Sequence, residues 1–128
     1  NLSKFSNYLQ NKIIKTQELT SSCNGLTQVL ALNYGSKDEI IRAIKKLNEK
    51  GLEVSEKNLE SCLDTAGISP VDIMIRTSGE VRLSNYLLWQ NAYAEMFFVF
   101  FYWPDFTKTE LDDIISDFSR RERRFGAV

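Results

Sequence analysis

Three short apolar stretches, residues 26–32, 71–75 and 97–102, alternate with longer segments whose apolar side chains recur at helical spacing. Apolar runs of this length are typical of buried strands. Prolines bound two of them, with Pro70 before the second run and Pro104 after the third. Strands that alternate with helices are joined by crossover connections, so the pattern predicts an α/β domain with a parallel sheet and flanking helices.

Helical periodicity marks the segments between and beside these strands. The predicted helices cover residues 3–19, 36–50, 55–66, 86–93 and 107–118. We predict N-terminal caps at Ser3, Ser36, Ser55 and Thr107, because serine and threonine side chains accept hydrogen bonds from the first N–H groups of a helix. Ser36 and Thr107 are each followed three residues later by a glutamate, which is the capping-box pattern.

The apolar faces of these helices supply most of the predicted core. The residues expected to face inward are Ile40, Ile41, Ile44, Leu47, Leu59, Cys62, Leu63, Ala66, Leu111, Ile114, Ile115 and Phe118. The aromatic-rich residues 97–103 either line an apolar tunnel for a lipid chain or belong to the core. Core is the commoner outcome for such a stripe, and it is the favoured interpretation.

Composition narrows the class of protein without naming a function. A chain of 128 residues suits one domain, residues 1–128, and its net charge of -1 gives no basic face for nucleic acid. The two cysteines form no C-x-x-C pair, which favours reduced thiols in a cytoplasmic protein. The sequence contains no histidine, which excludes Ser-His-Asp triads and His-ligated metals. Residues 97–103 are much shorter than the ~20 needed to cross a bilayer.

A polar segment with two arginines follows the strand predicted at residues 71–75. Ligands of open parallel sheets bind beyond the carboxyl ends of the strands, and guanidinium groups form bidentate hydrogen bonds with phosphate oxygens. The segment could therefore hold a diphosphate, or it could be a solvated loop whose arginines pair with Asp72 and Glu80. The residues concerned are Arg76, Thr77, Ser78, Gly79, Glu80, Arg82 and Ser84.

Glu95 is the second candidate, because a carboxylate in an apolar neighbourhood needs a partner or a metal ion. Mg²⁺ is often held by only one or two protein carboxylates, and an ion pair between Glu95 and a nearby arginine is the alternative. Glu80 could orient Arg76 or Arg82, or face water. The basic residues 120–124 are either a solvated helix end or a further contact for a phosphate, reached across a subunit interface.

Residues 75–90, Ile-Arg-Thr-Ser-Gly-Glu-Val-Arg-Leu-Ser-Asn-Tyr-Leu-Leu-Trp-Gln, resemble the signature of the cis-prenyltransferases, the undecaprenyl diphosphate synthase family. Residues 33–35, 92–95, 103–106 and 121–126 continue the match in the same order. The resemblance implies the carboxyl-terminal half of that α/β fold. It also implies condensation of isopentenyl diphosphate with an allylic prenyl diphosphate to a cis-polyprenyl diphosphate, an undecaprenyl lipid carrier in bacterial members.

The resemblance assigns roles residue by residue. Arg76, Arg82 and Ser84 would hold the diphosphate of isopentenyl diphosphate, and Leu83 would contribute its backbone. Glu80 would support them, and Glu95 would help to bind Mg²⁺. The terminal Arg124 and Gly126 resemble an R-x-G motif that supports the active site of a partner in a homodimer. A lipid product implies a cytoplasmic enzyme working at the membrane surface.

Two departures from the family pattern matter. Ser36-Lys37 stand where the family commonly has Gly-Arg, which keeps the charge but loses the planar fork. The Asp-Gly-Asn-Gly-Arg loop that carries the catalytic aspartate does not occur in the 128 residues. We therefore expect that the chain alone does not catalyse and contains no catalytic residue. A non-catalytic partner subunit of a heteromeric enzyme is the alternative, although retention of the arginines favours catalytic origin.

Overall fold

The computed structural model describes residues 2–124 of a chain that forms two compact units, residues 1–34 and 35–128. The first unit contains α1 (Asn7–Thr20). Ser6 is its N-cap, and its Oγ accepts a hydrogen bond from the N–H of Leu9 at 3.4 Å. The cap predicted at Ser3 is therefore wrong, because residues 2–5 form a turn closed by a bond from Phe5 N–H to the Leu2 carbonyl, 3.0 Å.

The strand predicted at residues 26–32 is also wrong. The chain from residue 21 to residue 35 consists of turns and irregular backbone. Leu26 is 94% exposed and Leu30 69%. A strand forms only when a neighbouring strand completes its hydrogen bonds, and this stretch has none. Its apolar side chains would be more stable if buried, but the described residues leave them exposed.

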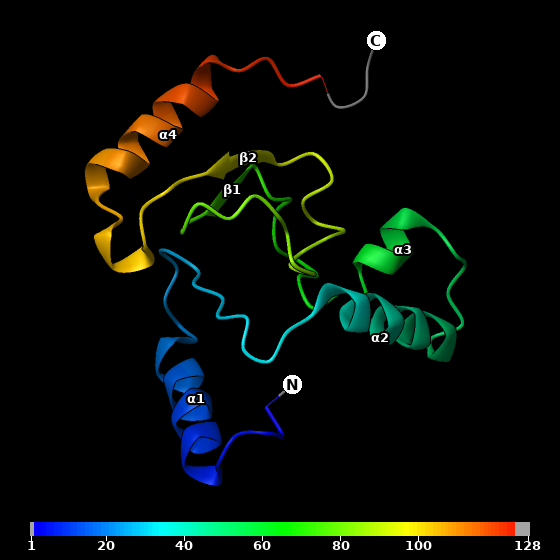
Figure 1. The fold of residues 1–128 in the computed structure, drawn as a ribbon. Coiled ribbons are helices and arrows are strands. Elements are labelled where there is room, and N and C mark those ends of the chain that lie inside the picture. The colour runs from blue at the N-terminus through cyan, green and yellow to red at the C-terminus, as the bar shows by residue number, and fades with distance from the viewer. Residues whose placement is uncertain (1, 125–128) are drawn as a thin grey trace. The chain divides into compact units, whose positions relative to one another are not determined.

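The second unit is built on two parallel strands, β1 (Ile73–Arg76) and β2 (Glu95–Phe98), which run side by side in Figure 1. Ile73 pairs with Glu95 at one end, and Arg76 pairs with Phe98 at the other. The α/β class and the parallel sheet are thus confirmed. β2 begins and ends earlier than the predicted strand over residues 97–102, and its four residues pair with the four residues of β1.

The aromatic run after β2 lies on the surface. Phe97 and Phe98 are half-buried, but Phe100 is 84% and Trp103 73% exposed. Since the strand ends at Phe98, the alternation that would bury every second side chain does not continue. The core interpretation is wrong for residues 100–103. The short η1 (Trp103–Asp105) follows, and Trp103 stacks on Phe106 with ring centroids 6.0 Å apart.

The core of the second unit lies between α2 (Ser36–Glu49) and α3 (Glu56–Glu60). Its buried members are Ala43, Leu47, Cys62 and Leu63, with Ile40, Leu59 and Trp89 packed against them. The Ser55 cap is confirmed. The helix it opens is shorter than predicted, and Ala66 is exposed along with Ile41 and Ile44 of α2. Among the described residues both cysteines are free, as expected.

An ion pair ties α2 to the turn after α3. Arg42 donates from Nη1 and Nη2 to the two carboxylate oxygens of Asp64, at 2.8 and 2.5 Å, and from Nε to Asp38 at 2.8 Å. The hydrogen bond from Arg42 holds the pKa of Asp64 below its usual value, with charge attraction acting in the same direction and partial burial against it. The fork geometry makes this a bidentate pair that fixes the turn on α2.

Two sequence patterns are misleading at the junction of α2 with the segment after β1. The N-cap of α2 is Gly35, and Ser36 lies inside the helix, so the capping box predicted at Ser36 is wrong. Residues 86–93 form turns, where we expected a short helix. Asn85 and Leu87 have φ of 64° and 45°. This left-handed conformation cannot continue a right-handed helix.

The last helix within residues 2–124 is α4 (Lys108–Arg120), whose capping box is confirmed. Thr107 N–H donates to Glu110 Oε2 at 2.6 Å, and Glu110 N–H donates to Thr107 Oγ1 at 3.5 Å. Ile114 is buried and Phe118 half-buried, whereas Leu111 and Ile115 remain exposed. Of the helices within residues 2–124, none has the length and apolar character that a membrane crossing requires.

Candidate functional site

The loop that leaves β1 lies against the segment that follows β2. Val99 N–H donates to the Arg76 carbonyl at 2.9 Å, and the N–H groups of Ser78 and Gly79 donate to the carbonyls of Phe101 and Val99. Ser78 and Gly79 have φ of 74° and 69°. A Cβ at Gly79 would approach a ring carbon of Phe100 to 3.0 Å, so the turn needs glycine there. These bonds fix the loop at the carboxyl end of the sheet.

Arg76 gathers the predicted ligand-binding residues. Its half-buried side chain extends from the last position of β1, and its Nη1 donates to Ser84 Oγ at 3.2 Å and to the carbonyl of Arg82. Both of these contacts use Nη1, whereas a guanidinium carries five N–H donors in all. The structure thus brings together Arg76, Arg82 and Ser84, the residues to which the family resemblance assigns one diphosphate.

Glu80 pairs with Arg82 within the same loop, one of the possibilities left open by the sequence. The Arg82 side chain remains 61% exposed, so the pair restricts the guanidinium without covering it. Leu83 is half-buried, and its carbonyl accepts the N–H of Tyr86 at 3.1 Å. The loop therefore offers two guanidinium groups and a hydroxyl near a single carboxylate, an excess of positive charge that suits an anion.

Glu95 does not lie with this group. It stands at the amino end of β2 opposite Ile73, whereas Arg76 stands opposite Phe98, three positions or roughly 10 Å further along the strands. Arg121 Nη1 donates to Glu95 Oε2 at 2.7 Å, which is the ion-pair alternative. Arg121 also binds Asp117 at 2.8 Å and covers the Phe97 ring at 4.2 Å. The hydrogen bonds that Arg121 donates to Glu95 and Asp117 raise its pKa.

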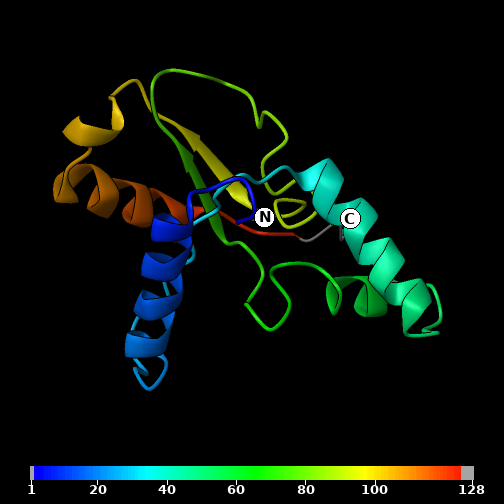
Figure 2. The same cartoon turned by 90° about the horizontal axis from the view of Figure 1, so that it is seen from below.

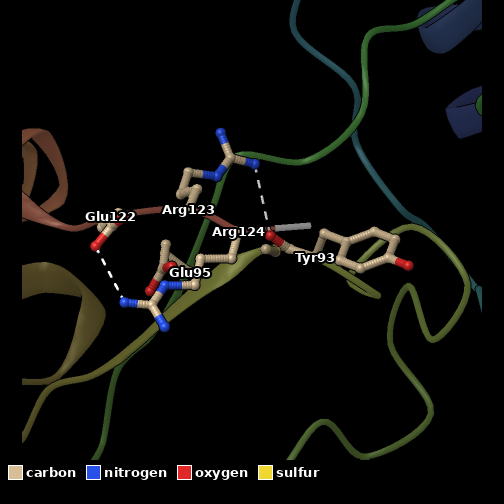
Figure 3. Close-up of a pocket in the computed structure, with 6 residues that line it drawn as sticks. Tyr93, Glu95, Glu122, Arg123 and Arg124 are labelled. Carbon is tan, nitrogen blue, oxygen red and sulfur yellow. Dashed lines mark hydrogen bonds and ion pairs between the residues drawn. The ribbon is translucent and has the colours of Figure 1, made fainter. Parts of the chain in front are cut away.

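A cavity of about 240 Å³ adjoins Glu95, and Figure 3 shows its lining. Arg124 pairs with Glu122 at 3.2 Å, and Arg123 donates to the Tyr93 carbonyl at 3.5 Å. Arg123 also donates to Asp72 at 2.6 Å. Asp72 therefore pairs with Arg123 of the basic residues 120–124, so the alternative in which a loop arginine pairs with Asp72 is wrong. Gly126, the other supporting residue of that segment, lies outside the described residues.

Among the residues described around this cavity, Glu95 would be the single protein ligand of Mg²⁺. No cluster of three or more candidate metal ligands occurs within residues 2–124. The Glu95 side chain is 26% exposed, so its carboxylate remains accessible despite the ion pair. Mg²⁺ commonly takes one or two protein carboxylates and completes its octahedron with water and substrate phosphate. One accessible carboxylate is consistent with that mode of binding.

Fold and loop together are those of an α/β protein with a candidate anion site beyond a parallel strand. The family model for putative undecaprenyl diphosphate synthase matches residues 1–126. An isoprenyl transferase of Wolinella succinogenes is 58% identical over 127 residues, which are 99% of this chain and 56% of that protein. The chain belongs to the cis-prenyltransferase family, whose members include undecaprenyl diphosphate synthases.

Two further relatives extend the comparison. A ditrans,polycis-undecaprenyl-diphosphate synthase of Aliivibrio fischeri, specific for (2E,6E)-farnesyl diphosphate, is 44% identical over 133 aligned positions, covering 98% of this chain and 52% of that protein. The crystal structure of a probable undecaprenyl diphosphate synthase from Campylobacter jejuni matches with a TM-score of 0.91 at 44% identity, covering 98% of this chain and 60% of the other. The chain spans about half the length of the curated relatives it matches.

Proposed function

We propose that this chain carries the isopentenyl diphosphate site of a cis-prenyltransferase that extends an allylic diphosphate, with an undecaprenyl diphosphate as product. The convergence of Arg76 on Ser84 Oγ and on the Arg82 carbonyl is the observation that supports it. Arg76 and Arg82 would donate to the diphosphate oxygens, Ser84 would add a hydroxyl, and Leu83 would add backbone. Glu80 would orient Arg82, with which it pairs.

The rest of the active site would come from outside this group. Glu95 is the residue that would hold Mg²⁺, and the bound ion would offset negative charge on diphosphate oxygens. Arg124 and Gly126 would support the active site of a second subunit in a homodimer. An enzyme with these substrates and a lipid product would work in the cytoplasm at the membrane surface, without nucleic acid.

Replacing Arg82 with alanine tests the site. Loss of a charge-assisted hydrogen bond should weaken isopentenyl diphosphate binding about tenfold, as measured by titration calorimetry. Arg120→Ala removes the same charge from the surface of α4, where Arg120 meets Asp117 at 3.7 Å, and should leave the dissociation constant unchanged. In a full-length enzyme containing this chain, Arg82→Ala should raise KM for isopentenyl diphosphate much more than KM for the allylic substrate. Equal effects on both substrates would argue against the assignment.

A turnover assay tests whether this chain catalyses by itself or needs the remaining part of the fold that its relatives have. Supplied with Mg²⁺, farnesyl diphosphate and isopentenyl diphosphate, the 128-residue chain should form no product. The reason is chemical, because the chain supplies groups for one diphosphate and lacks the family's catalytic-aspartate loop. Radiolabelled isopentenyl diphosphate and solvent extraction of the lipid would measure it. Detection of a longer prenyl diphosphate would show that the chain catalyses by itself and binds more than isopentenyl diphosphate.

A further inference from the structure

The segment that carries Ser84 has an unusual backbone. Ser84, Asn85 and Leu87 have φ of 49°, 64° and 45°. Left-handed conformations are uncommon for residues with a Cβ, although asparagine adopts them more readily than most. Three of them within four positions persist only where the surrounding structure holds the chain in place. The question is therefore what holds this turn.

The amino end of α2 holds it. Ser36 N–H donates to the Asn85 carbonyl at 2.8 Å, and Lys37 N–H donates to Asn85 Oδ1 at 2.9 Å. The first N–H groups of a helix have no partner within it, and the N-cap Gly35 offers no side chain. Asn85 thus caps α2 from 48 positions away in the sequence. Figure 2 shows the start of α2 beside the segment that follows β1.

Two further contacts make the junction specific. Leu88 N–H donates to Oγ of the fully buried Ser36 at 3.0 Å, which fixes the far side of the turn. A Cβ at position 35 would lie 2.9 Å from Asn85 Nδ2, so glycine is what allows the close approach. The turn is therefore fastened at Asn85 and at Leu88, with Ser84 immediately before it.

We propose that Asn85 is a positioning residue for the diphosphate site, an inference that rests on the proposed function. By capping α2, Asn85 fixes the left-handed turn that places Ser84 Oγ and the Arg82 carbonyl within reach of Arg76. It sets the affinity for isopentenyl diphosphate through these neighbours and does not itself touch the ligand. The part of the site preorganised in this way is the one proposed for the diphosphate, because Ser84 Oγ and the Arg82 carbonyl both contact Arg76.

Two substitutions at Asn85 separate its side chain from its backbone. Asn85→Gly keeps the left-handed conformation and the carbonyl that accepts from Ser36, but loses the bond from Lys37. Asn85→Ala loses that bond and also disfavours the conformation. The dissociation constant for isopentenyl diphosphate should rise about threefold in the glycine variant and about tenfold in the alanine variant, as loss of one cap bond and then of the turn geometry implies.

Ser55→Ala is the matched control, because it removes a cap bond of comparable kind, from Asn58 N–H to Ser55 Oγ at 3.3 Å, at the start of α3. It should lower the melting temperature as much as Asn85→Gly and leave the dissociation constant unchanged. Equal weakening of binding by Ser55→Ala, or binding by both Asn85 variants that matches the unsubstituted chain, would overturn the positioning role. Absence of any binding by the unsubstituted chain would instead overturn the proposed function.

Discussion

Arg76→Ala is expected to weaken binding of isopentenyl diphosphate about 100-fold, which is roughly 2.7 kcal/mol. The loss combines two effects. One guanidinium that would donate to the diphosphate is gone, and charge-assisted hydrogen bonds contribute about 1.5–3 kcal/mol each. The Arg82 carbonyl and Ser84 Oγ also lose the donor that holds them at the end of β1. Titration calorimetry on the unsubstituted and substituted chains measures the difference.

Arg76→Lys is the informative control for this prediction. Arg76 donates to Ser84 Oγ and the Arg82 carbonyl from Nη1 alone, which leaves its other N–H groups for a diphosphate. Lysine keeps the positive charge at the strand end but has no planar fork with which to do both. We expect it to recover about tenfold of the affinity lost in the alanine variant. A lysine variant as tight as the unsubstituted chain would mean that charge alone matters at this position. An alanine variant of unchanged affinity would remove Arg76 from the site.

Glu39→Ala is expected to lower the free energy of unfolding by about 3 kcal/mol, the cost typical of leaving buried polar groups without their charged partner. Glu39 is fully buried in α2. Its Oε1 accepts the Asp64 N–H at 2.9 Å, and both carboxylate oxygens lie 3.1 Å from Gln90 Nε2. Removing the carboxylate leaves these donors facing an apolar methyl group and separates α2 from both segments. Urea denaturation followed by circular dichroism measures the change.

Glu49→Ala provides the matched control, since Glu49 is an exposed residue of the same helix. Its free energy of unfolding should change by less than about 0.5 kcal/mol. Glu39→Gln should fall between the two, because an amide oxygen still accepts from Asp64 while its NH₂ group faces that of Gln90. Loss of stability in Glu39→Ala no greater than in Glu49→Ala would show that the buried network contributes little.

Local chemistry was predictable from the sequence where neighbouring residues decide the outcome. Thr107 and Glu110 cap α4 by their own side chains, so their spacing alone was sufficient. The grouping of Arg76 with Ser84 was likewise predictable, because Arg76 ends β1 and Ser84 lies in the loop that leaves it. In each case the determining contacts span few residues.

Long-range contacts account for several of the predictions that were wrong. Ser36 and Glu39 fit a capping box, yet their side chains bind Leu88, Asp64 and Gln90, which lie far along the chain. The sequence around Asn85 does not indicate that it caps a distant helix. Only the tolerance of asparagine for left-handed backbone is consistent with its position in the turn. Apolar runs such as residues 26–32 indicate that burial is required without indicating what provides it. For Glu95, likewise, the sequence indicated that a partner was needed but did not identify it, because Arg121 lies 26 positions away.

The cap that Asn85 places on α2 has a consequence for how the site forms. The Asn85 side-chain bond with Lys37 and the bond of Leu88 with Ser36 join residues 48 and 52 positions apart. Contacts of such separation form late in folding because a long loop must close first. A species with β1 and β2 already paired would present Arg76 without an ordered loop opposite it. Local opening at the start of α2 would therefore weaken the proposed diphosphate binding while the strand pair stays intact.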